Sequence, residues 1–179
     1  MTKQRLEKGL TQVYTGNGKG KTSAALGLAL RAIGWGFKVH MIQFIKGGDF
    51  KHGELHIIEQ LPDFKLKAFG RGRYITEDPP LEEDIKLAEK ALKFARKIIN
   101  SGEYDIVILD EINVALHLKL IKTNEVVELI ENKPKHIELV LTGRYAPSEI
   151  IEVADLVTEM REVKHPYTQG ALGRKGIEY

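Results

Sequence analysis

No cysteine occurs among the 179 residues of this chain. Disulfide bonds, thiolate metal sites and a cysteine nucleophile are therefore excluded, so any metal ion must be held by oxygen or imidazole ligands. The sequence also lacks an apolar run long enough to cross a bilayer. Because its first residues have no apolar centre of the kind found in secretory signals, we expect a cytoplasmic protein without membrane partners.

The chain also has no large excess of positive or negative charge. The chain has 27 Lys and Arg against 25 Asp and Glu, and the net charge is +2. Basic residues are dispersed among acidic ones, which gives little support for a nucleic-acid-binding surface. The length and the hydrophobic content of 42% suit one globular domain. We expect a single domain over residues 1–179, in which residues 1–9 form either an N-terminal arm that reaches a partner subunit or a frayed end.

Apolar segments that resemble buried strands alternate with helical segments along the chain. A long helix is predicted from Leu81 to Ile99, and shorter helices are predicted at Thr123, taken as an N-cap, and after Pro147. This alternation predicts an α/β fold with a mostly parallel sheet. The six predicted strands are Leu10–Tyr14, Val39–Phe44, Phe64–Phe69, Ile106–Asp110, Ile137–Thr142 and Leu156–Val163.

The run TGNGKGKTS, from Thr15 to Ser23, lies at a predicted strand-to-helix turn. Backbone N–H groups and the positive end of the helix dipole converge there, which favours a polyphosphate. Lys21 would reach phosphate oxygens, and the Thr22 hydroxyl would contact Mg²⁺. Three glycines would permit positive φ and close backbone approach: Gly16, Gly18 and Gly20. Because Thr15 stands where the usual pattern begins with glycine, an ordinary glycine-rich turn is the alternative.

The run DIVILDE ends an apolar strand with two adjacent carboxylates, Asp110 and Glu111. A buried strand that presents a carboxylate at its carboxyl end is typical of a Walker B segment, which holds Mg²⁺ or Mn²⁺ beside a phosphate. Together with the glycine-rich run it predicts a metal-nucleotide site with Thr22, Asp110 and Glu111 at the metal. The alternative is a helix N-terminus that carries acidic residues.

Two further possibilities have weaker support. His52, Glu54 and His56 are closely spaced, but they do not match HExxH and no third ligand is evident. No serine lies in a G-x-S-x-G segment, so triad hydrolysis is not indicated.

Five segments in order resemble the ATP:co(I)rrinoid adenosyltransferases of the CobA, CobO and BtuR type. They are YTGNGKGKTSAALGLALRAIGWG, QFIKGGDFKHGE, VILDEINVAL, LTGRYAPSEIIEVADLVTEM and KHPYTQGALGRKGIEY. The resemblance implies a P-loop NTPase (RecA-like) three-layer fold with about six strands. It implies transfer of the 5'-deoxyadenosyl group of ATP to the Co(I) centre of a reduced corrinoid, with release of triphosphate, in adenosylcobalamin synthesis or corrinoid salvage. It also suggests a homodimer and an electron-donor reductase of the flavodoxin kind.

The resemblance assigns roles residue by residue. Lys21, Glu111 and Arg144 would be catalytic, and Arg31 and Lys46 match basic family positions. Arg31 has the alternative role of a surface helix cation. The phosphate loop would comprise Gly16, Asn17, Gly18, Lys19, Gly20, Lys21, Thr22 and Ser23. Lys164 and His165 would either line the corrinoid face or have a structural role.

One segment departs from the family pattern. The family commonly reads GxGFxW, whereas this chain reads GRGRYI and puts Arg73 and Ile75 at the aromatic positions. Either Tyr74 substitutes, or the enzyme prefers corrinoids without a strong lower base, or the substrate is altered. Two other functions stay open: a P-loop ATPase or phosphotransferase, and a RecA-like nucleotide-binding module. The product distinguishes them, since only adenosyl transfer releases triphosphate.

Overall fold

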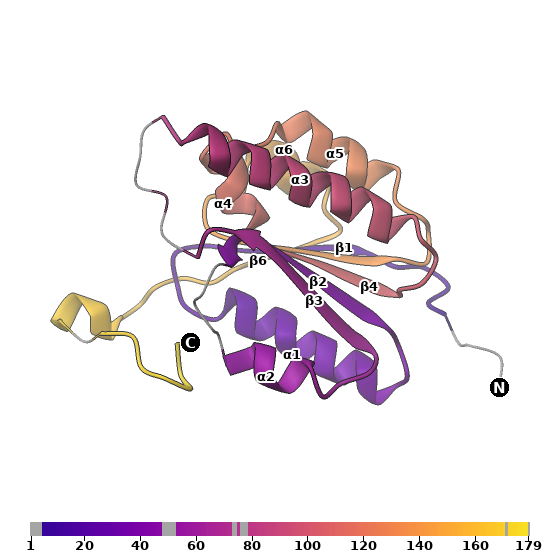
Figure 1. Cartoon of the computed structure of the whole chain (residues 1–179), viewed down its shortest axis with the longest axis horizontal. Coiled ribbons are helices and arrows are strands. Elements are labelled where there is room, and N and C mark those ends of the chain that lie inside the picture. Colours follow the sequence, from indigo (N-terminus) through magenta and orange to yellow (C-terminus); the bar gives the residue numbers. More distant parts are fainter. Residues whose placement is uncertain (1–4, 48–52, 73–74, 76–78, 171, 179) are drawn as a thin grey trace.

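A six-stranded parallel sheet forms the middle layer of the described part of the chain. The computed structural model describes residues 5–47, 53–72, 75, 79–170 and 172–178. The strand order is β3-β2-β4-β5-β1-β6, so β1, the first strand in the chain, lies between the last two (Figure 1). The strands are β1 (Thr11–Thr15), β2 (Val39–Gly47), β3 (Phe64–Gly70), β4 (Ile106–Asp110), β5 (Glu138–Thr142) and β6 (Leu156–Glu159).

Helices cover both faces of this sheet and complete a three-layer α/β fold (Figure 1). One face carries α1 (Lys21–Gly34) and α2 (Gly53–Ile58). The other carries α3 (Glu82–Ile99), α4 (Ile112–His117), α5 (Thr123–Glu131) and α6 (Ser148–Val153). Pro166–Gln169 form a short 3₁₀ helix near the C-terminal end. Within the described ranges, no helix has the length and apolarity needed to span a membrane.

Side chains of the central strands alternate between the two layers of the core. In β4, Val107 and Leu109 pack toward α3, while Ile106 and Ile108 pack toward α1. Both sets are almost completely buried. A strand covered on both faces reads as a continuous apolar run, and this is why the runs in the sequence identified the strands.

The predicted sheet is confirmed, and the differences lie at element ends and in two short helices. The last strand was predicted to reach Val163 but ends at Glu159 because the chain then turns against the glycine-rich loop, where Met160 accepts a backbone hydrogen bond. Thr123 was wrong as an N-cap: Lys122 occupies that position, and Thr123 begins the helix. The six-residue helices α2 and α4 were not predicted, because they are too short to show a helical period.

His40 of β2 is a buried polar residue on the α3 side of the core. Its ring packs 5.5 Å from Phe94 and 4.8 Å from Tyr104, measured between ring centroids. Neither ring nitrogen has a hydrogen-bond partner in the described part of the chain. Burial, with help from the nearby charges of Lys67 and Lys65, lowers the pKa of His40 to about 4. The folded protein therefore keeps this imidazole neutral where an unfolded chain would protonate it.

We expect two glycine substitutions to change stability in opposite directions. A Cβ on Gly9 would lie 2.2 Å from the carbonyl carbon of Ile137, whereas a Cβ on Gly27, exposed on α1, would meet nothing within 4 Å. Gly9→Ala should lower the free energy of unfolding by about 2 kcal/mol or more. Gly27→Ala should raise it by about 1 kcal/mol through helix propensity. Urea denaturation measures both, and equal effects would contradict the close packing at Gly9.

The protein should lose stability as pH falls from 6.5 to 4, in part because of His40. In this window the unfolded chain binds a proton at position 40 that the folded chain does not, so the free energy of unfolding falls with pH, by about 3 kcal/mol at pH 4. His40→Leu should remove the contribution of His40 to the pH dependence of the free energy of unfolding. Parallel stability curves for the native protein and His40→Leu between these pH values would rule out the neutral, buried imidazole.

Candidate active site

The glycine-rich loop joins β1 to α1 and is closed on one side by the segment that follows β6. Gly16 and Gly20 have φ of 91° and 121°, in the left-handed region that favours glycine. Gly18 is required for a different reason: its N–H donates to the Met160 carbonyl at 2.6 Å, and a Cβ there would lie 2.6 Å from the same oxygen. The chain after β6 thus fixes the shape of the loop.

Lys21, the first residue of α1, turns back into the loop. Its Nζ donates to the carbonyl oxygens of Gly16 and Gly18, each at 2.7 Å. Burial lowers the pKa of Lys21, the negative charge of Glu111 raises it, and the positive charge of Arg144 lowers it. Glu111 and Arg144 therefore lie close enough to act electrostatically on the cation inside the loop.

Asp110, at the carboxyl end of β4, is completely buried and accepts hydrogen bonds from four side chains. Oδ1 accepts from the hydroxyls of Thr142 at 2.7 Å and Thr22 at 2.9 Å. Oδ2 faces Lys46 Nζ at 3.1 Å and accepts from Gln43 Nε2 at 3.3 Å. A carboxylate offers about four lone-pair positions, so these donors use its acceptor capacity.

Lys46 stays charged in this cluster. Burial alone would lower the pKa of Lys46, but the Asp110 carboxylate, together with the charges of Glu111 and Glu54, outweighs that effect, and the net pKa is raised. A charged lysine beside an ionised aspartate is the pairing that makes two buried charges tolerable.

Strand register explains why these side chains meet. Gln43 of β2 pairs with Asp110 of β4, and Leu109 pairs with Leu141 of β5, which brings Thr142 beside Asp110. The three polar residues form a row on the α1 side at the carboxyl ends of parallel strands, where α/β sheets bind ligands. The sequence did not lead us to predict Gln43 and Thr142 as site residues. The signal for Thr142 was a polar residue at the end of an apolar strand.

Glu111 follows Asp110 in a left-handed backbone conformation, with φ 61° and ψ 20°, at the N-cap of α4. Such a conformation costs about 1–3 kcal/mol in a residue other than glycine. The Glu111 N–H donates to Thr142 Oγ1 at 3.0 Å. Burial and the neighbouring Asp110 charge raise the pKa of the Glu111 carboxyl, and Lys46 acts against them. Within the described part of the chain this carboxylate accepts no hydrogen bond, so it can bind a cation.

The remaining predicted residues lie around this centre or away from it. Asn17, Lys19 and Ser23 are exposed on the loop and the first turn of α1. Lys19 pairs with Glu178 near the C-terminal end at 2.8 Å. Arg144 is exposed after β5, and its charge acts on Lys21 and Glu111.

Several predicted residues are not part of the cluster around Asp110. Arg31 lies in the last turn of α1, where its charge acts on Tyr14. His165 accepts a hydrogen bond from the Tyr167 N–H at 3.1 Å, a contact that caps the 3₁₀ helix. Ile75 is half-buried against the α3-side core. Three residues fall outside the described residues: His52, Arg73 and Tyr74. In the ranges that the structure describes, no three His, Asp or Glu side chains gather in a metal-binding group.

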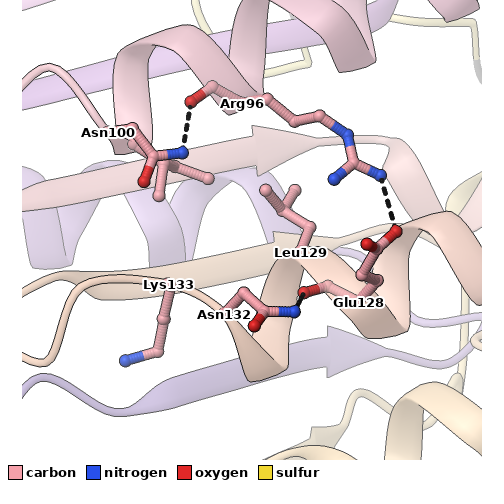
Figure 2. Close-up of a pocket in the computed structure, with 7 residues that line it drawn as sticks. Arg96, Asn100, Glu128, Leu129, Asn132 and Lys133 are labelled. Atoms are coloured by element: carbon pink, nitrogen blue, oxygen red, sulfur yellow. Dashed lines mark hydrogen bonds and ion pairs between the residues drawn. The ribbon is translucent and has the colours of Figure 1, made fainter.

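A surface cavity between α3 and α5 (Figure 2) lies toward the amino ends of β1 and β5, away from the glycine loop. Its cations already have partners. Arg96 donates to the Glu125 carbonyl and faces Glu128, and Lys133 donates to the carbonyls of Gly9 and Ile137. None of the residues that line the cavity belongs to the glycine loop or to the cluster around Asp110.

The sequence is similar to known proteins over almost its whole length. The family model described as "ATP:corrinoid adenosyltransferase BtuR/CobO/CobP" matches residues 7–179. A corrinoid adenosyltransferase of a Sinorhizobium species is 41% identical over 97% of this chain and 81% of its own length. The corrinoid adenosyltransferase of Pseudomonas aeruginosa is 38% identical over 98% and 86%.

A solved structure supports the fold. The flagellar accessory protein FlaH from Methanocaldococcus jannaschii superimposes with a TM-score of 0.55 at 13% identity, over 86% of this chain and 72% of that one. At this identity the likeness concerns the fold alone, and with the glycine loop and parallel sheet it confirms the P-loop NTPase, RecA-like class.

We expect Lys21→Ala to weaken the binding of ATP. Loss of a charge-assisted phosphate contact is worth about 2–4 kcal/mol, or roughly 30- to 1,000-fold in affinity. Lys93→Ala, which removes an exposed lysine of α3, serves as the control for a change in net charge. Isothermal titration calorimetry measures both variants. Equal affinities for Lys21→Ala and Lys93→Ala would refute a phosphate contact by Lys21.

Proposed function

The chain belongs to the ATP:corrinoid adenosyltransferase family, and we propose that the glycine loop and the Asp110 cluster hold the triphosphate of ATP during transfer. The activity follows from the family: the enzyme transfers the adenosyl group of ATP to a corrinoid. The observation that supports the proposed site is the buried Lys21 ammonium, which lies inside the loop and in the electrostatic range of Glu111 and Arg144.

In the proposed reaction, the cobalt of a Co(I) corrinoid attacks C5' of ATP. A Co–C bond forms with the electron pair of cobalt, and the C5'–O bond breaks, so that its electrons leave with triphosphate. Co(I) is a strong nucleophile, so the protein needs no general base and acts by positioning and electrostatics. Lys21, the loop N–H groups and Arg144 would stabilise the charge that develops on the leaving triphosphate.

The side chains around Thr22 fit a divalent cation, Mg²⁺ or Mn²⁺. Thr22 gives its hydroxyl proton to Asp110 at 2.9 Å and accepts from Lys46 Nζ at 3.4 Å, which leaves one lone pair for a metal, and the Glu111 carboxylate offers two more oxygens. Hydroxyl and carboxylate oxygens suit these hard cations. We propose Thr22 and Glu111 as the direct ligands. Asp110 belongs to the site as the acceptor that orients Thr22. The bound cation supplies charge neutralisation on the triphosphate.

We further propose that the enzyme works as a cytoplasmic homodimer of single-domain subunits. Strand β6 is an edge strand that exposes Leu156 and Val157, each about 40%, beside the glycine loop. An exposed apolar edge of this kind favours a protein contact. Of the predicted N-terminal arm, residues 1–4 lie outside the described residues, and Arg5 donates to the Gly102 carbonyl of the same chain.

A separate protein is proposed as the source of the electron that reduces the corrinoid. With no cysteine, the chain has no dithiol of its own to pass electrons. A flavodoxin-like reductase fits this need. The near-neutral charge gives no support for a nucleic-acid partner.

We expect the purified protein, given ATP, Mg²⁺ and a chemically reduced corrinoid, to form a light-sensitive Co–C product. Triphosphate should appear in equal amount, because one C5'–O bond breaks for each Co–C bond. Ion chromatography of the nucleotide products and absorbance of the corrinoid measure the two. Corrinoids with and without a strong lower base should be compared, since the GRGRYI segment lacks the family's aromatic pair. Release of ADP and phosphate instead would identify an ATPase or phosphotransferase.

A further inference from the structure

We propose that Thr142 is a positioning residue that sets the orientation of both acids in the site. This inference rests on the proposed function, because it concerns how the enzyme presents Glu111 and Thr22 to a metal-bound triphosphate. Thr142 ends β5, is completely buried and lies on neither the glycine loop nor the acidic pair.

The hydroxyl of Thr142 connects the two acids through different groups. A threonine hydroxyl has one proton and two acceptor lone pairs. The proton goes to Asp110 Oδ1 at 2.7 Å, and a lone pair accepts the Glu111 backbone N–H at 3.0 Å. Because the single proton is used on Asp110, the hydroxyl necessarily acts as the acceptor toward Glu111. One side chain therefore fixes the carboxylate of one acid and the backbone of the next.

The Glu111 carboxylate depends on this contact for its direction. Its backbone adopts the left-handed conformation that side-chain-bearing residues rarely take, at φ 61°. A hydrogen bond to the N–H of the same residue holds the peptide in that conformation. Without the acceptor, Glu111 would relax toward an ordinary backbone conformation, and its carboxylate would point elsewhere.

Thr22 depends on the same hydroxyl through Asp110. Thr142 and Thr22 share Oδ1 as acceptor, while Lys46 and Gln43 occupy the Oδ2 side. Loss of the Thr142 donor would let the carboxylate rotate toward the cation of Lys46. The Thr22 proton, and with it the direction of the Thr22 lone pairs, would follow.

Thr11 offers a matched control within the same sheet. Its hydroxyl is buried at the start of β1 but has no hydrogen-bond partner in the described ranges. Thr11→Val and Thr142→Val make the same isosteric change, and only the second removes hydrogen bonds. The comparison separates the loss of a hydroxyl from the loss of its contacts.

The experiment measures Mn²⁺ binding to the ATP complex by electron paramagnetic resonance, together with kcat and KM. T142V should weaken Mn²⁺ binding and lower kcat by about tenfold or more, as loss of an outer-shell contact does. The affinity for metal-free ATP and the KM for the corrinoid should stay within about twofold, since Thr142 contacts neither ligand on this proposal. T142S, which keeps the hydroxyl, should restore Mn²⁺ binding, and T11V should match the native protein.

Two results would overturn the proposal. Native Mn²⁺ binding by folded T142V would show that the hydroxyl does not position the acids, and a T142S as defective as T142V would assign the effect to packing. If T142V does not fold, T142A removes the same hydroxyl and carries the same expectation. Release of ADP by the native enzyme would refute the proposed function instead, and Mn²⁺ binding would still report on Thr142.

Discussion

The buried carboxylate of Asp110 is the constraint on which the site and the centre of the sheet both depend. An ion without solvent costs several kcal/mol unless it is paired and hydrogen-bonded. Its four donors come from three elements: Thr22 from α1, Gln43 and Lys46 from β2, and Thr142 from β5. They meet only if β4 lies between β2 and β5 in the observed register. The same arrangement of strands therefore both stabilises the buried charge of Asp110 and builds the site.

Asp110 and Glu111 are adjacent and look equivalent in the sequence, but they have different roles in the cluster. Asp110 has its acceptor positions filled by protein donors, whereas Glu111 is turned out of the strand by its left-handed backbone and keeps its oxygens available. Lys21 and Lys46 are likewise different: the first is held by loop carbonyls and the second by a carboxylate. The end of β4 thus contributes one acid that is structurally engaged and one that can face a ligand.

Much of this could be predicted from the sequence because the relevant signals are local. Apolar runs identified the strands, and the glycine loop and DIVILDE carried the central residues of the site. Gln43 and Thr142 were out of reach because their importance depends on which strands are neighbours, and β2, β4 and β5 are far apart in the chain. Gly18 was expected to admit phosphate, but it also accommodates Met160, a contact that no local pattern encodes. The resemblance, and not the spacing, supplied the roles of Arg144 and Lys46.

The place of β1 in the sheet has a consequence for the order of assembly. The first strand pairs with β5 on one side and β6 on the other, and the glycine loop that follows it is braced by Met160. In a chain growing on the ribosome, the glycine loop is therefore made early but cannot take its final shape until the last strands have been made. Pairings of such long sequence separation form slowly. On the proposed function, nucleotide binding would follow the end of synthesis, and a chain that stops before β6 would carry the loop without the Met160 contact that shapes it.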